Sequence, residues 1–180
     1  MKKKITFILG GARSGKSAFA LKEASKTSGN KAYIATAEAL DEEMQQRIEN
    51  HKRQRSKDWI TYEEPLRIAE VIKKIESTCS AIVIDCLTLW LSNVMHGNPD
   101  IGYEIENLVD TLHTARNASC IYIVSNEVGM GIVPENEVAR KFRDMAGILN
   151  QKVAEVSDEV YMVVAGIALK IKEEYHAGDT

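Results

Sequence analysis

Cysteine is scarce in this sequence, and the few cysteines present do not suggest a covalent or metal-bound framework. The three cysteines are Cys79, Cys86 and Cys120. An odd number at wide spacing, each in apolar surroundings, is unlike a disulfide framework or a zinc site. We therefore expect three small buried side chains and a reducing, cytoplasmic environment.

Long apolar runs and a strong charge of one sign are also lacking. No stretch approaches the roughly 20 apolar residues that span a bilayer, and the run at residues 5–9 is too short for a signal peptide. The formal net charge of −3 provides no field that gathers nucleic acid or an anionic membrane. We expect neither a membrane span nor a nucleic-acid partner.

The chain does contain short apolar runs rich in β-branched residues, which alternate with longer segments of helical period. The runs typical of buried strands cover residues 5–9, 32–35, 81–84, 121–124 and 160–164. The helical segments cover residues 42–55, 66–75, 105–115 and 136–156. This alternation predicts an α/β fold with a mostly parallel sheet flanked by helices.

Three further segments are assigned from weaker signals. Residues 59–62 and 167–171 are candidate additional strands, and residues 96–102, where Gly, Asn and Pro cluster, are expected to form a flexible connection. The chain has only three prolines and no linker-like composition, so residues 1–180 are expected to form one domain.

Residues 10–17 read GGARSGKS and fit the phosphate-binding pattern G-x-x-x-x-G-K-[ST]. They follow an expected strand and open an expected helix, which is the context that this P-loop pattern requires. Backbone N–H groups of such a loop and the dipole of the following helix favour phosphate oxygens. Lys16 is predicted to reach the β and γ phosphates of a nucleotide and Ser17 to bind Mg²⁺. The predicted phosphate contacts are Gly10, Gly11, Ala12, Arg13, Ser14, Gly15, Lys16 and Ser17.

A P-loop site usually takes a second Mg²⁺ contact from an acid at the end of another buried strand. Asp85 directly follows the apolar run at residues 81–84 and is the candidate for this contact. The same carboxylate could cap a helix that begins near Leu87. The two roles are compatible.

Arg47, His51 and Arg55 recur at intervals of four residues, so they share one face of an expected helix. Such a stripe is usually a solvated surface. If the substrate is a nucleotide, a neutral imidazole can attack phosphorus directly and the guanidinium groups can offset phosphate charge. The spacing alone leaves both interpretations open.

The sequence resembles the bifunctional adenosylcobinamide kinase / adenosylcobinamide-phosphate guanylyltransferase family of cobalamin assembly over residues 5–172. Besides the P-loop, the shared motifs are YIATA at 33–37, RIENHKRQR at 47–55, DCLT at 85–88, SNEVGMGIVP at 125–134, and RDMAG at 143–147 with Asn150 and Gln151. The P-loop is widespread, whereas the last three motifs in this order are typical of the family.

This resemblance implies two reactions. Adenosylcobinamide first takes a phosphoryl group from ATP or GTP, and the product then takes GMP from GTP through GMP bound to a histidine, which corresponds to His51. It also implies Mg²⁺, a recombinase-like P-loop fold and a homotrimer. The implied nucleotide contacts beyond the P-loop are Ala35, Thr36, Ala37, Lys52, Arg53, Gln54, Arg55, Glu63 and Asp85. From sequence alone, Glu63 is equally a solvated acid beside Glu64.

Some alternatives stay open at this point. A small-molecule kinase of the same fold would lack guanylyl transfer and any covalent nucleotide. A GTP-dependent switch is disfavoured because no N-K-x-D motif is present, and a DNA-binding ATPase is disfavoured by the acidic balance. Arg140, Arg143, Gly147 and Asn150 share one face of an expected helix, where either substrate contact or helix packing would explain them.

Overall fold

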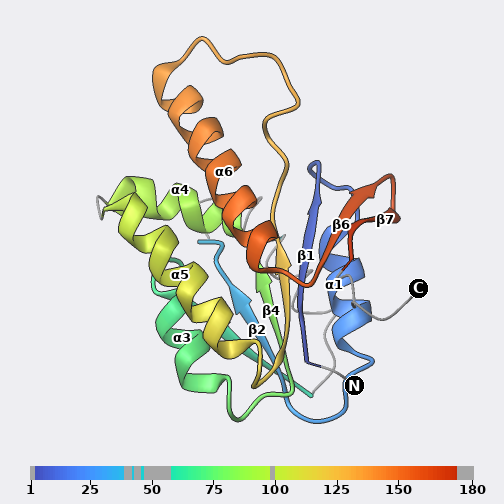
Figure 1. Cartoon of the computed structure of the whole chain (residues 1–180). Helices are drawn as coiled ribbons and strands as arrows, with labels where there is room; N and C mark the ends of the chain where they lie inside the picture. Colours follow the sequence, from blue (N-terminus) through green and yellow to red (C-terminus); the bar gives the residue numbers. More distant parts are fainter. Residues whose placement is uncertain (1–2, 39–41, 43–45, 47–57, 98–99, 174–180) are drawn as a thin grey trace, which may run out of the picture.

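A seven-stranded sheet forms the centre of the molecule (Figure 1). The computed structural model describes residues 3–38, 42, 46, 58–97 and 100–173. The strands are β1 (Ile5–Gly10), β2 (Lys31–Ala35), β3 (Trp59–Glu63), β4 (Ala81–Asp85), β5 (Cys120–Val124), β6 (Glu159–Val164) and β7 (Ile167–Lys172). Their order across the sheet is β3-β2-β4-β5-β1-β6-β7, and all neighbours are parallel except β6 and β7.

The predicted α/β fold with a mostly parallel sheet is confirmed. Each apolar run from the sequence forms a strand, and so do the two weaker candidates, β3 and β7. The expected flexible connection at residues 96–102 is wrong at both ends, because α4 (Leu87–Gly97) and α5 (Ile101–Ala115) extend into it. Asp100 caps α5 by accepting a hydrogen bond from the Tyr103 backbone N–H.

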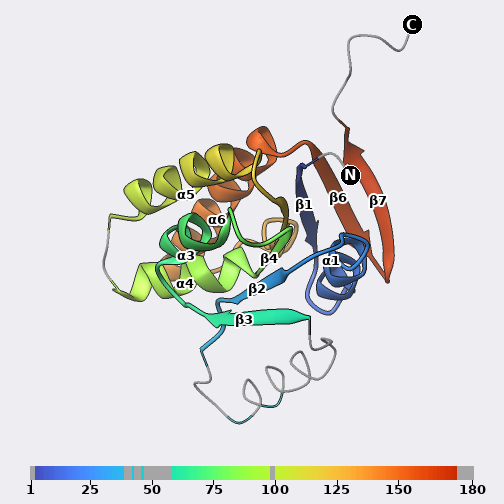
Figure 2. The ribbon, with the colours of Figure 1, turned by 90° about the horizontal axis from the view of Figure 1, so that it is seen from below.

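Helices cover both faces of the sheet, as Figure 2 shows. On one face α1 (Lys16–Ala24) packs over β1, β4 and β5. The opposite face is covered by α3 (Ile68–Ile75), α4, α5 and α6 (Glu137–Val156). Successive strand residues point to opposite faces, so on β4 Val83 packs with α1 while Ile82 and Ile84 pack with the other helices.

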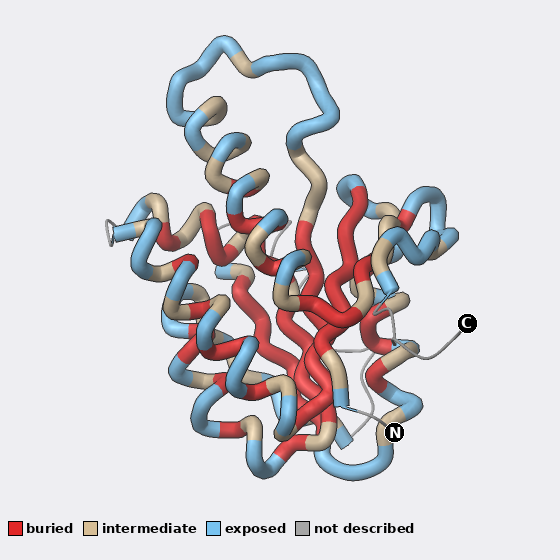
Figure 3. Tube along the Cα trace, viewed as in Figure 1, coloured by how far each residue is buried: buried red, intermediate tan, exposed pale blue. Residues whose placement is uncertain are grey.

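The central strands are buried on both faces, which explains their uninterrupted apolar sequences. Figure 3 shows these buried runs and the exposed loop that follows β5. The three cysteines are buried and form no disulfide, as the sequence predicted. Within the part of the chain that the structure describes, no helix is both long and apolar enough to cross a bilayer.

The topology determines where a ligand can bind. The chain leaves β1 toward α1 on one face and leaves β5 toward α6 on the other. Neighbouring parallel strands whose connections diverge in this way open a crevice at their carboxyl ends. A cavity of about 530 Å³ lies instead at the opposite edge, beside Ser80 and Cys120 at the amino ends of β4 and β5. The P-loop contributes nothing to that cavity.

Candidate functional site

The P-loop lies between the carboxyl end of β1 and the first turn of α1. Gly10 and Gly15 have φ angles of 151° and 100°, and Arg13 is left-handed at 57°. A Cβ atom on Gly10 would overlap the Val163 carbonyl oxygen of β6. The two glycines of the motif are therefore required by the backbone conformation and, at Gly10, by a close neighbour as well.

Carbonyl groups of the P-loop accept hydrogen bonds from other parts of the protein. The Gly10 carbonyl accepts from the Glu127 N–H at 3.1 Å, and the Ser14 carbonyl accepts from the Gly166 N–H at 2.9 Å. The Gly11 carbonyl accepts from the Ser14 N–H at 3.3 Å. A trans peptide places its C=O and N–H on opposite sides. Fixing the Gly10 and Ser14 carbonyls toward the segments that donate to them therefore directs the N–H groups of Gly11 and Gly15 the opposite way, toward the side of the loop where an anion binds.

Lys16 is the buried cationic group of the loop, and the other cation, Arg13, is exposed. Lys16 is 6% exposed, and its Nζ donates to the Gly11 carbonyl at 2.5 Å. Burial lowers the pKa of Lys16, and nearby acidic groups, among them Asp85, oppose this shift. Burial, together with the charge of Asp85, raises the pKa of the Cys86 thiol to about 11. The thiol is thus neutral near pH 7, and the Asp85 carboxylate is the negative charge that Lys16 experiences.

Asp85 ends β4 on the α1 face of the sheet, two residues after Val83. Its Oδ2 accepts a 2.6 Å hydrogen bond from the Tyr33 hydroxyl, which holds the carboxylate in place. Ser17, in the first turn of α1, is half-buried. A hydroxyl and a single carboxylate are the protein ligands that Mg²⁺ commonly takes beside nucleotide phosphates. The residues present therefore fit this metal.

Thr36 follows β2 and is fully buried. Its hydroxyl accepts from the Cys86 N–H and donates to the Cys86 carbonyl, both at 2.8 Å. The peptide bond between Asp85 and Cys86 is cis. Thr36 thus ties the end of β2 to the turn after Asp85. Its predicted nucleotide contact stays a prediction, and the structure adds a positioning role that the sequence did not indicate.

Ala35, Asp85 and Glu63 lie at one level of the carboxyl edge, because Ala35 pairs with both of the acidic residues. Ala37 is half-buried just beyond this edge. Glu63 is exposed and lies on β3, four strands from β1. At about 4.8 Å per strand, the separation from the P-loop strand is about 19 Å. Glu63 therefore shares the edge with the P-loop but not its phosphate site.

Other motif residues make buried and part-buried polar contacts after β5 and along α6. The Asn126 side chain donates to the Thr88 hydroxyl at 2.8 Å, and the Ser125 hydroxyl donates to the Asn150 side chain at 2.8 Å. Arg140 donates to the Pro134 carbonyl at 3.0 Å. Asn150 and Arg140 thus have packing and loop-holding contacts, one of the two explanations that the sequence left open.

Sequence reasoning did not indicate two contacts near the site. Tyr33 is buried in the core, and its hydroxyl also donates to Asp85, because strand alternation places Tyr33 on the same face as Ala35. The contact of Gly166 with Ser14 was not indicated, because it joins residues far apart in the sequence. The predicted nucleophile His51 and the contacts Lys52, Arg53, Gln54 and Arg55 lie outside the described residues.

Solved structures show the same fold. The chain is similar to a solved ATPase domain, with a TM-score of 0.52 and 15% identity, over 89% of this chain and 69% of that one. It is similar to the RadB recombinase with a TM-score of 0.52 and 14% identity, over 89% and 74% of the two chains. These likenesses confirm the recombinase-like arrangement of the sheet and helices.

Sequence comparison identifies the family. The chain is 41% identical to the bifunctional adenosylcobalamin biosynthesis protein CobP of Pseudomonas aeruginosa, over 93% of this chain and 96% of that protein. It is 38% identical to the bifunctional adenosylcobalamin biosynthesis protein CobU of Escherichia coli, over 92% and 98%. The family model for cobinamide kinase / cobinamide phosphate guanyltransferase matches residues 6–171. The chain therefore belongs to this family of bifunctional cobinamide kinases and guanylyltransferases of adenosylcobalamin biosynthesis.

Proposed function

We propose that this chain performs both reactions of its family at the carboxyl edge of the sheet, with the P-loop as the site for the nucleotide phosphates. In the first reaction the hydroxyl of adenosylcobinamide takes the γ-phosphoryl group of ATP or GTP. In the second, the new phosphate takes GMP from GTP and pyrophosphate leaves, giving adenosylcobinamide-GDP. One arrangement carries this proposal. Hydrogen bonds from neighbouring segments hold carbonyl groups of the P-loop, and Lys16 and Asp85 lie near each other on the α1 face of the sheet.

In the kinase step the acceptor oxygen forms a bond to the γ-phosphorus while the bond to the β-phosphate oxygen breaks. The acceptor loses its proton and the nucleoside diphosphate leaves. Lys16 and the N–H groups of the P-loop stabilise the phosphate charge. Ser17 and Asp85 would hold Mg²⁺, which neutralises charge on the phosphates when it is bound.

In the guanylyl step a ring nitrogen of His51 forms a bond to the α-phosphorus of GTP, and pyrophosphate leaves. Imidazole is largely neutral near pH 7 and needs no separate base. A phosphate oxygen of adenosylcobinamide phosphate then attacks the same phosphorus, and the bond to His51 breaks. The proposed contacts of the guanine nucleotide outside the P-loop are Lys52, Arg53, Gln54, Arg55 and Glu63, together with Ala35, Thr36 and Ala37 at the end of β2.

The activity is tested directly by supplying adenosylcobinamide, ATP, GTP and Mg²⁺ and separating the corrinoid products by mass. We expect adenosylcobinamide phosphate first and adenosylcobinamide-GDP later. EDTA in excess is expected to stop both conversions, and excess Mg²⁺ is expected to restore them. Omitting GTP from a mixture that contains ATP shows whether ATP alone can supply the phosphoryl group. Accumulation of the phosphate alone with all components present would show a plain kinase and contradict the proposal.

We also propose, from the family resemblance, that the chain assembles as a homotrimer, and two separate exposed apolar surfaces support self-association. The loop surface consists of Met130, Ile132, Val133 and Val138, and the hairpin surface consists of Val164, Ile167, Leu169 and Ile171. Figure 1 shows the segment after β5 that carries the first at the top of the molecule, and the β6–β7 hairpin that carries the second at one side. Contact between different surfaces of successive copies forms a closed ring when the rotation between copies closes, and exposed apolar groups of this extent favour such contact.

Charged substitutions test this assembly. Ile132 is 97% exposed and Leu169 is 54% exposed, so Ile132→Asp and Leu169→Asp should each leave the fold intact while burying a charge in the interface. The expected result is a shift from three copies to one in light scattering after gel filtration. Tyr103→Asp, at a 65% exposed position on α5, is the control and should leave the mass unchanged. A native chain that elutes as a monomer would refute the proposal.

A further inference from the structure

The turn between β6 and β7 has an unusual backbone. It consists of two residues, Ala165 and Gly166, with φ angles of 51° and 81°. Positive φ at both central positions is the geometry of a type I′ hairpin turn, which favours Asn, Asp or Gly. An alanine in the left-handed region is disfavoured. Such a conformation persists where contacts with the surrounding structure hold the turn in place.

The turn contacts the P-loop. The Gly166 N–H donates to the Ser14 carbonyl at 2.9 Å. A Cβ atom built on Gly15 would lie 3.3 Å from the Gly166 Cα, and one built on Gly10 would overlap the Val163 carbonyl. Both glycines of the phosphate-binding motif therefore face the backbone of this hairpin. The hairpin excludes a side chain at Gly10 and leaves only a tight fit for one at Gly15.

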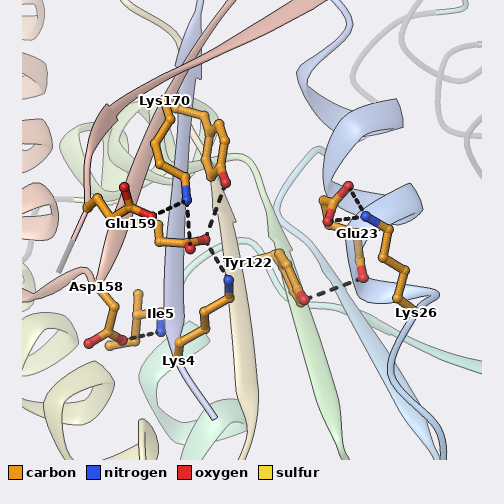
Figure 4. A network of polar contacts seen from close by, with 10 residues as sticks. Lys4, Ile5, Glu23, Lys26, Tyr122, Asp158, Glu159 and Lys170 are labelled. Carbon is orange, nitrogen blue, oxygen red and sulfur yellow. Dashed lines mark hydrogen bonds and ion pairs between the residues drawn. The ribbon is translucent and has the colours of Figure 1, made fainter. Parts of the chain in front are cut away.

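The hairpin is also fixed at its other end, as Figure 4 shows. Glu159, at the start of β6, accepts from Lys4 at 2.6 Å and from Lys170 of β7 at 3.1 Å. Farther along β6, the Tyr161 ring packs on Phe19 of α1 with centroids 5.0 Å apart. The hairpin is thus bound to the chain just before β1 and to α1, on the two sides of the P-loop.

We propose that the β6–β7 turn positions the P-loop for phosphate binding, with Gly166 as the positioning residue. Its N–H holds the Ser14 carbonyl toward the hairpin, and because the peptide is trans the Gly15 N–H then points the opposite way, into the loop. An N–H fixed in this direction is ready to donate to a phosphate oxygen without reorganisation. This inference rests on the proposed role of the P-loop as the nucleotide site.

The test compares three turn variants of the full chain by calorimetric binding of ATP and of inorganic tripolyphosphate. In Gly166→Val a β-branched side chain disfavours positive φ, which displaces the N–H, and both ligands should bind about tenfold more weakly. Gly166→Asn tolerates positive φ and should recover most of the affinity. Ala165→Gly keeps the Gly166 N–H, and binding should equal that of the native chain.

The kinetic expectation separates positioning from loss of structure. For Gly166→Val the KM for the phosphoryl donor should rise about tenfold, as for binding, while the thermal midpoint without nucleotide stays within a few degrees of the native value. If this variant does not fold, Gly166→Ala replaces it, since a Cβ there meets open space, and a smaller rise is expected. Native-like affinity in folded Gly166→Val, or in the Gly166→Ala chain that replaces it, would overturn the inference. A native chain that binds neither ligand would instead refute the nucleotide site itself.

Discussion

His51→Ala is expected to abolish the covalent labelling of this protein by GTP that carries its label on the α-phosphorus. The native chain should retain label that is lost in acid and stable in base. The label is held by a phosphorus–nitrogen bond, and imidazole becomes a good leaving group when it is protonated. Alanine has no nucleophile to offer. The measurement is the label remaining on the denatured protein after removal of free nucleotide.

A second histidine provides the control for this experiment. His113 is exposed on α5, away from the carboxyl edge, and His113→Ala should be labelled to the native extent. The His51→Ala chain should still convert adenosylcobinamide to its phosphate, because that step needs the P-loop and not the imidazole. Label on His51→Ala equal to that on the native chain would show that another group is the nucleophile. A native chain that binds GTP but takes up no label would contradict the proposed two-step transfer.

Strand existence could be predicted from sequence because each central strand is buried on both faces and is therefore uniformly apolar. The order of the strands could not be predicted in the same way. Insertion of β4 between β2 and β5 depends on which helices cover which face, and a local apolar pattern does not contain that information. The consequence for Glu63 is direct, since only the strand order shows that it lies four strands from β1.

The residues of the candidate site also differ in whether a local sequence pattern could indicate them. The P-loop and Asp85 were found because each is a local pattern at the end of an apolar run. Tyr33 and Gly166 were not, because their roles depend on hydrogen bonds across the fold, to Asp85 and to Ser14. His51 came from helical spacing and family resemblance, and its role stays a prediction.

Lys16→Met is expected to reduce the turnover number of adenosylcobinamide phosphorylation on the order of a thousandfold, the scale found when a group that stabilises transferred phosphate is removed. Methionine is similar in length and keeps the packing of the side chain but has no charge or donor. The measurement is the initial rate of corrinoid phosphate formation at saturating donor. Lys22→Met, at an exposed position on the same helix, is the matched control and should keep the native rate.

The same substitution should not weaken the fold, which makes the loss of rate interpretable. Burial already lowers the pKa of Lys16, which means that the protein bears a cost for holding the charged amine away from water. An apolar side chain removes that cost, so the thermal midpoint of Lys16→Met should equal or exceed the native value. Guanylyl transfer should fall together with phosphorylation, because both reactions place a triphosphate in the same loop, whereas His51→Ala should affect only the second. A Lys16→Met chain that retains more than about a tenth of the native rate would show that the loop does not hold the reacting phosphates.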